Sequence, residues 1–212
     1  MNEMMIRDVT DKIFYRVINT ELNRMLIDSA PSIEFPEYGV SKVFYAFLKA
    51  DKFKADTLLI NDPVAEFLGF SVEELNHFAE RNTFKLFPTT AIPFAEVKEA
   101  MPEFDDEDCN IGLDMEFFVL TNDYYDKGSH AMFNREFLDG FAKATSEKRL
   151  YIIPMTEHEV FLVRGSQVRR EYDVQMMKDC LRSFANDEEF HSNMLSYECM
   201  IYDVETREYS VA

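Results

Sequence analysis

The sequence predicts an α+β fold in which mixed or antiparallel sheets, built from hairpins, are covered by packed helices. Short runs rich in Val, Ile, Phe and Tyr are interspersed with isolated helical patterns, without the regular strand–helix–strand alternation of a parallel sheet. Leu, Ile, Val and Phe supply 60 of the 212 residues. This apolar content is sufficient for a hydrophobic core even though the formal net charge is −18.

The first elements are predicted to be a helix followed by a hairpin. Apolar residues recur at steps of three and four over residues 10–28, which is the period of one helical stripe. Pro31 and Pro36 end this helix and favour an extended segment after it. Residues 40–49 and 55–60 are then rich in β-forming side chains and predict an antiparallel pair.

Two further helices are predicted from their start signals. Asn61, with proline in the first turn, begins a short helix that ends at Gly69. Ser71 and Glu74 form a capping box, in which a hydroxyl at the cap is followed three residues later by a carboxylate. The helix that this box begins extends to about Lys85.

A cluster of carboxylates separates the two halves of the chain. Residues 95–116 contain nine acidic residues and one basic residue, which predicts an exposed loop. This acidic loop divides an N-terminal α+β subregion, residues 1–94, from a C-terminal one, residues 117–212; the alternative is that both pack as one domain. The elements predicted after it are a strand at 115–121, a helix at 134–144, paired strands at 150–154 and 160–164, a helix at 172–185, and a hairpin of 197–203 with 208–211.

Composition limits the compartment and the partners. No apolar run approaches the roughly 20 residues of a transmembrane helix, and the N-terminus lacks the pattern of a secretory signal. The three cysteines are widely spaced, which is typical of reduced thiols and predicts a cytoplasmic protein. A pI near 4.6 disfavours direct binding to nucleic acid or to an anionic membrane, and it favours a basic protein partner. The oligomeric state is left open.

No motif in the sequence predicts a cofactor or a metal. The six glycines are scattered and form no phosphate-binding loop. The cysteines and histidines lack the short paired spacings of a zinc site. The acidic loop does not match the glycine and glutamate register of a calcium-binding EF-hand.

Two polar clusters are candidate sites. His158 is flanked by carboxylates, so His158 with Glu159 could supply a general base or a pH-sensitive contact; the alternative is a turn whose polar side chains face water. Arg164, Arg169 and Arg170 form the strongest basic cluster of the chain. This cluster could bind an anionic ligand, contact the acidic loop, or simply lie on the surface.

The order of several segments resembles a bacterial domain-of-unknown-function family, number fifty-six eighty-eight. The segments are DKIFYRVIN at 11–19, TLLINDPVAEFLGFSVEELNHFAERNTFKLFP at 57–88, FFVLTN at 117–122 and LYIIPMTEHEVFLV at 150–163. Members usually carry about another hundred residues before this part, a size that suits one more small domain. The resemblance therefore implies a short member or a piece of a longer protein.

The resemblance also implies a set of recurrent polar positions, which are candidate binding residues: Asn82, Thr83, Thr121 and Asn122. Where the family has a Pro-Ser-Ser-x-His-Glu segment, this chain has PMTEHE at 154–159. The loss of the first serine puts any shared hydroxyl chemistry in doubt. The family itself has no assigned activity.

Three functional hypotheses follow from these observations. The first is a non-catalytic, intracellular interaction or regulatory module with an acidic surface, because residues 95–116 and 171–212 together carry −15 of the net charge of −18. A sharper version is a DNA mimic that occupies the basic site of a partner. The alternative is a small hydrolase or transferase that uses His158 and Glu159, and it predicts a pocket that contains His158.

Overall fold

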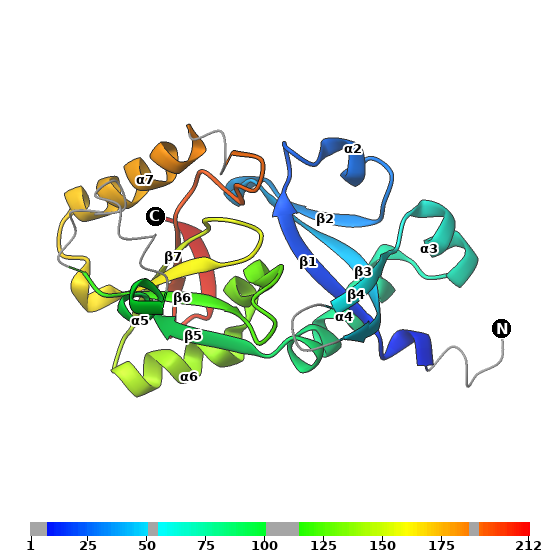
Figure 1. Cartoon of the computed structure of the whole chain (residues 1–212), viewed down its shortest axis with the longest axis horizontal. Helices are drawn as coiled ribbons and strands as arrows, with labels where there is room; N and C mark the ends of the chain where they lie inside the picture. The colour runs from blue at the N-terminus through cyan, green and yellow to red at the C-terminus, as the bar shows by residue number, and fades with distance from the viewer. Residues whose placement is uncertain (1–7, 51–54, 101–114, 187–190) are drawn as a thin grey trace.

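The computed structural model describes residues 8–50, 55–100, 115–186 and 191–212 (Figure 1). It confirms the α+β class. None of the described helices is long and apolar enough to cross a membrane. The strands are β1 (Ile13–Asn19), β2 (Ser32–Phe35), β3 (Val40–Ala50), β4 (Ala55–Leu59), β5 (Thr89–Pro93), β6 (Phe117–Asn122), β7 (Arg149–Ile153), β8 (Val160–Arg164), β9 (Met200–Asp203) and β10 (Glu208–Val211). The α-helices are α2 (Arg24–Ile27), α3 (Asp62–Leu68), α4 (Val72–Leu86), α5 (Phe94–Ala100), α6 (Arg135–Thr145) and α7 (Glu171–Ala185), and the 3-10 helices are η1 (Pro36–Tyr38), η4 (Gly128–Phe133) and η5 (Gly165–Gln167).

The described strands form two antiparallel sheets. In the first sheet β1 and β2 flank β3, and β4 also pairs with β3. The second sheet has the strand order β10-β9-β7-β8-β6-β5. The chain passes from the first sheet to the second between α4 and β5, so β5 pairs with β6 although it precedes the acidic segment.

The two sheets share one hydrophobic core. Tyr15 and Phe44 of the first sheet belong to the same buried cluster as Leu120 and Ile152 of the second. Residues of α4 and α6 complete this cluster, including Leu75. Side chains alternate between the two faces of a strand, so the neighbours of these residues face the opposite side of each sheet.

A second layer covers the outer face of the second sheet. Phe161 and Val163, which alternate with the inward-facing Leu162, belong to a separate buried cluster. Helix α7 contributes Met177 to this cluster, and α5 contributes Val97 at its edge. Helices α5 and α7 therefore lie on the same face of the same sheet.

The prediction of a helix over residues 10–28 is wrong. Residues Ile13–Asn19 form β1, and only the short α2, Arg24–Ile27, is helical in the second part of the segment. Six of the seven residues of β1 are buried, because its two faces both pack against other elements. A strand buried on both faces gives a continuous apolar run, and such a run satisfies a helical spacing as well as an extended one.

The predicted acidic loop is also corrected where the structure describes it. Residues Phe94–Ala100 form helix α5, in which Val97 packs inward while Glu96 and Glu99 are exposed. Residues 101–114 of this loop, with Cys109, lie outside the described residues. Strands β2 and β5 were not predicted, since each is short and bounded by proline.

The predictions that were based on local signals are confirmed. The Asn61 side chain accepts a hydrogen bond from the Val64 amide at 3.2 Å and caps α3, and the Ser71–Glu74 capping box is formed in full. The β3–β4 hairpin, α6, the β7–β8 pair, α7 and the β9–β10 hairpin lie within a few residues of the predicted bounds.

Side chains complete the hydrogen bonds of the outer edge of β1. The side-chain amide of Asn82 donates to the Ile13 carbonyl at 2.9 Å and to the Thr10 carbonyl at 2.7 Å. The Thr83 hydroxyl accepts from the Tyr15 amide at 3.1 Å, and the Ser129 hydroxyl donates to the Val17 carbonyl at 3.0 Å. Buried backbone groups without partners are costly, so these three side chains replace a missing neighbouring strand.

We expect the substitution Asn82→Ala to lower the free energy of unfolding by about 2–3 kcal/mol, because two buried carbonyls lose their donor. Asn76→Ala on the same helix is the matched control. The Asn76 side-chain oxygen is buried without a hydrogen-bond partner, so its removal should leave stability unchanged or raise it. Urea unfolding monitored by circular dichroism measures both values. Equal losses in the two variants would contradict this account of the β1 edge.

Candidate functional site

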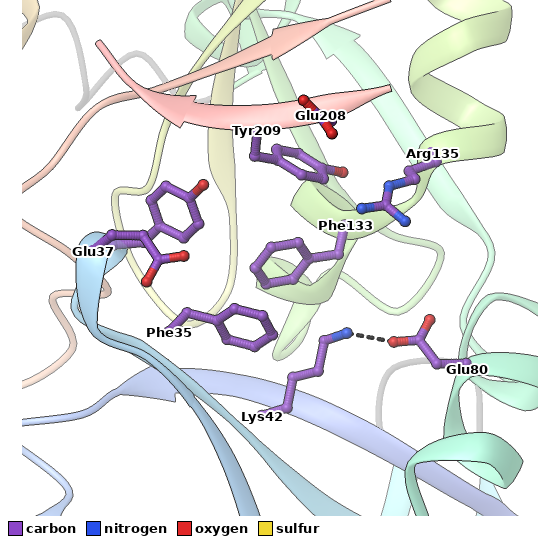
Figure 2. A pocket seen from close by; sticks show the side chains of 9 residues that line it. Phe35, Glu37, Lys42, Glu80, Phe133, Arg135, Glu208 and Tyr209 are labelled. Atoms are coloured by element: carbon purple, nitrogen blue, oxygen red, sulfur yellow. Dashed lines mark hydrogen bonds and ion pairs between the residues drawn. The ribbon is translucent and has the colours of Figure 1, made fainter. Parts of the chain in front are cut away.

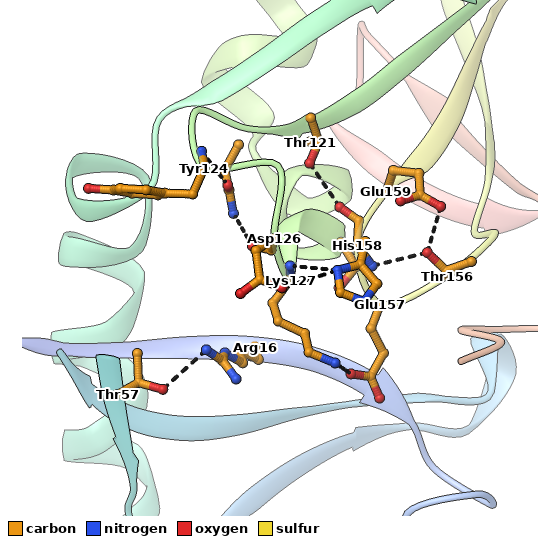
Figure 3. A network of polar contacts seen from close by, with 12 residues as sticks. Arg16, Thr57, Thr121, Tyr124, Asp126, Lys127, Thr156, Glu157, His158 and Glu159 are labelled. Atoms are coloured by element: carbon orange, nitrogen blue, oxygen red, sulfur yellow. Dashed lines mark hydrogen bonds and ion pairs between the residues drawn. The ribbon is translucent and has the colours of Figure 1, made fainter. Parts of the chain in front are cut away.

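The turn between β7 and β8 carries the predicted His158 and Glu159 (Figure 3). The Thr156 hydroxyl donates to the Glu159 carboxylate at 2.6 Å and accepts from the His158 amide at 3.1 Å. The carboxylate of Glu159 is therefore held by Thr156 and not by the imidazole. These contacts fix the shape of the turn.

The loop after β6 packs against this turn. The amide of Gly128 and the hydroxyl of Thr121 both donate to the His158 carbonyl, each at 2.9 Å. The side chain of Asn122 donates to the Asp126 carbonyl at 2.8 Å and accepts from the Tyr124 amide at 2.9 Å. Thr121 and Asn122 thus lie beside His158, but they bind backbone groups.

The Nδ1 atom of His158 faces two groups of the loop after β6, one a hydrogen-bond donor and one a carboxylate. Its Nδ1 accepts a hydrogen bond from the Lys127 amide at 3.2 Å, which requires a neutral ring with Nδ1 unprotonated. The same Nδ1 also lies 3.2 Å from the Asp126 carboxylate. Lys127 also forms an ion pair with Glu157 (Figure 3). A histidine beside a carboxylate is one component of acid–base chemistry.

The three arginines of the basic cluster have different roles. The guanidinium of Arg164 donates to Glu116 at 2.7 Å, and Glu116 is the last residue of the predicted acidic loop. The amides of Arg169 and Arg170 donate to Asp173 in the first turn of α7, at 2.9 and 3.0 Å. These amide donors hold the pKa of the Asp173 carboxyl below its usual value, with a contribution from the Arg170 guanidinium.

The described residues line an open cavity of about 350 Å³ between the two sheets (Figure 2). Its walls come from β2, β3 and η1 of the first sheet, from α4, η4 and α6, and from β10 of the second sheet. His158 and Glu159 do not line it. The lining residues are Phe35, Glu37, Tyr38, Lys42, Glu80, Phe133, Arg135, Glu208 and Tyr209.

A buried lysine forms the floor of this cavity. The ammonium of Lys42 is paired with Glu80 and lies 4.3 Å from the centre of the Tyr15 ring and 5.0 Å from that of Phe133. Burial lowers the pKa of Lys42, although the carboxylate of Glu80 opposes this effect. Sequence analysis did not identify this site, because its residues are separated in the chain and have no common motif.

His130 is a second buried group between the sheets. Its Nδ1 lies 3.1 Å from the Lys127 carbonyl, and its ring packs 5.7 Å from that of Phe87. Burial lowers the pKa of His130 to about 4, which keeps the imidazole neutral at physiological pH. Among the described residues, no group of three or more His, Cys, Asp or Glu side chains is arranged to hold a metal ion.

Comparison with known proteins places the chain in a family. The sequence model described as "Family of unknown function (DUF5688)" matches residues 2–204, so the chain belongs to this family. Neither the curated proteins nor the solved structures yielded a match. The family assignment therefore brings no activity, ligand or partner with it.

We expect Gly128→Ala to lower the free energy of unfolding by about 2 kcal/mol through overpacking. A Cβ at this position would lie 2.4 Å from the Thr121 hydroxyl and 2.7 Å from the His158 carbonyl. Gly140→Ala in α6 is the control, since no atom lies within 4 Å of its added Cβ. The control should raise stability by about 0.5–1 kcal/mol because alanine favours the helix. Thermal or urea unfolding measures the predicted loss of stability in one variant and the predicted gain in the other. If Gly128→Ala leaves the free energy of unfolding unchanged, the packing argument is refuted.

We expect His130 to make the protein less stable in mild acid. Its pKa is about 4 in the folded state and about 6.5 in the unfolded state, so the unfolded chain binds a proton that the folded one does not. The free energy of unfolding should therefore fall by about 3 kcal/mol between pH 6.5 and 4, and this contribution should level off below pH 4. Urea titrations at several pH values compare the wild type with His130→Asn and with the control His77→Asn. Only His130→Asn should reduce the change in the free energy of unfolding between pH 6.5 and 4. The same pH dependence in the wild type and in both variants would contradict the prediction.

Proposed function

We propose that the protein is a non-catalytic interaction module of the bacterial cytoplasm that binds a basic protein partner through an acidic layer. The observation that carries this proposal is the position of α5 and α7, which cover the same outer face of the second sheet. Each helix belongs to one of the two acidic segments of the sequence, 95–116 and 171–212. The first helix of each acidic segment therefore lies on the same face of the second sheet.

The contacts of the predicted polar residues give them a structural role and do not form a catalytic site. Asn82 and Thr83 hold the β1 edge, and Thr121 and Asn122 hold the loop next to His158. Each of these side chains is buried and hydrogen-bonded to backbone. Residues that act on a substrate need an accessible functional group, whereas these groups stabilise the fold.

On the acidic layer itself, exposed carboxylates are available to a partner. Glu96 and Glu99 are exposed on α5, and Glu171 is exposed on α7. A net charge of −18 produces a long-range field that attracts a basic surface and repels phosphate. If the partner is a DNA-binding protein, this layer would act as a DNA mimic and would compete with duplex DNA for the same site.

One observation favours the alternative of a small hydrolase or transferase. The Asp126 carboxylate lies 3.2 Å from Nδ1 of His158, and such a pair orients an imidazole for proton transfer. The cavity between the sheets is lined by other residues, so a substrate of this site would have to bind on the open turn. The interaction module therefore remains the proposal that the geometry favours.

We expect the double substitution Glu96→Gln/Glu99→Gln to weaken binding of a basic partner about fivefold, since exposed ion pairs contribute a few tenths to one kcal/mol each. The matched control is Glu21→Gln/Glu66→Gln, which removes the same charge from exposed positions outside this layer. Binding is measured with the tagged protein and the basic proteins that it captures from a bacterial lysate, followed by titration of each purified protein. Binding should be lost above about 0.5 M salt, where electrostatic screening acts within a few ångströms.

Three outcomes of this experiment would each have a clear meaning. Release of the captured protein by added duplex DNA would support the DNA-mimic version. Equal weakening by the two double variants would show that the total charge, and not the acidic layer, is responsible. Capture that is insensitive to salt and to both variants would overturn the proposal.

A further inference from the structure

The cavity between the two sheets has no part in the acidic layer, and its composition points to a ligand of its own. Three aromatic rings form a row through it (Figure 2). The rings of Phe35 and Phe133 have their centres 5.3 Å apart, and those of Phe133 and Tyr209 are 5.5 Å apart and nearly perpendicular. Such a row provides a flat apolar surface against which a planar group can pack, and aromatic side chains lose little conformational entropy when they are fixed.

The charged residues of the cavity are not all neutralised within the protein. Lys42 is paired with Glu80, and its side chain is only 8% exposed. Arg135 stacks on Tyr209, with its guanidinium carbon 5.5 Å from the ring centre. Neither Arg135 nor Glu37 forms an ion pair with another described residue. Arg135 is thus left available to a negative group of a ligand, and Glu37, like Glu208 at the cavity wall, is left available to a positive one.

Glu37 and Arg135 lie on opposite sides of the aromatic row. Figure 2 shows Glu37 at one side and Arg135 at the other, with the ring of Phe133 between them. Glu37 follows β2 in the first sheet, whereas Arg135 begins α6, so the packing of the two sheets sets their separation. An occupant that uses both groups must therefore carry its charges at its two ends.

We propose that this cavity binds a short aromatic zwitterion, with an amine at one end, a flat ring in the middle and a carboxylate at the other end. The amine pairs with Glu37, the ring lies against Phe35, Phe133 and Tyr209, and the carboxylate pairs with Arg135. A guanidinium is well suited to a carboxylate because its planar donors can bind both oxygens.

Electrostatics favours a zwitterion over a ligand with a single charge. A simple anion is repelled by the net charge of −18 before it reaches Arg135. A simple cation can pair with Glu37 or Glu208, but it leaves Arg135 without a partner. A ligand with no net charge avoids the long-range repulsion and still pairs with one group at each end.

Calorimetric titration of the full chain with three matched compounds tests the proposal. The probe is para-(aminomethyl)benzoic acid, which carries both charges on one ring. Para-toluic acid lacks the amine, and para-methylbenzylamine lacks the carboxylate. We expect the zwitterion to bind about fivefold more tightly than either relative, in line with the strength of one partly exposed ion pair. Equal affinity for all three compounds, or no detectable binding of the zwitterion, would overturn the proposal.

Two substitutions assign the ends of the ligand. Arg135→Met should remove the advantage of the zwitterion over para-methylbenzylamine, and Glu37→Gln should remove its advantage over para-toluic acid. The controls are Arg169→Met and Glu205→Gln, which remove the same charges from exposed positions outside the cavity. All four positions are exposed, so the variants should fold, and circular dichroism verifies this. If the controls weaken binding as much as the cavity variants, net charge governs the affinity and the assigned contacts are refuted.

Discussion

The hydrogen bonds along the outer edge of β1 are the constraint on which the rest of the structure depends. Strand β1 is buried on both faces, so water cannot reach its unpaired amide and carbonyl groups. Asn82 and Thr83 of α4 and Ser129 of η4 supply the missing partners. Helix α4 belongs to the part of the chain before the second sheet, and η4 follows β6 within it. The edge of β1 therefore connects the part of the chain that forms the first sheet to the part that forms the second.

This attachment also determines which polar groups meet between the sheets. With Ser129 held at β1, the loop before it lies against the turn that contains His158, where Gly128 and Thr121 share one carbonyl. On the other side of the core, Lys42 of β3 pairs with Glu80 of α4 beneath Phe133. The polar side chains of Asn82, Thr83 and Thr121 thus have a structural role, because they join elements that are far apart in the chain.

The described charged residues of the protein fall into two groups, one exposed on the surface and one between the sheets. Exposed carboxylates lie on the helices over the outer face of the second sheet, where water screens them and a partner can reach them. Between the sheets Lys42 is paired with Glu80, and burial lowers the pKa of both Lys42 and His130. Arg135 and Glu37 differ from these groups in having no ion-pair partner among the described residues. The cavity between the sheets and the acidic layer therefore differ in position, exposure and charge.

The sequence by itself determined the α+β class, the capped helices α3 and α4, and the hairpins, because each of these depends on contacts between residues close in the chain. His158, Thr121 and Asn122 stay predicted site residues; in the structure Thr121 donates to the His158 carbonyl and Asn122 to the carbonyl of Asp126. Only the tertiary structure decided that residues 13–19 are a strand, because burial on both faces hides the alternation that marks one. The cavity was likewise decided by packing, since its charged and aromatic residues come from seven separate elements and no local pattern connects them.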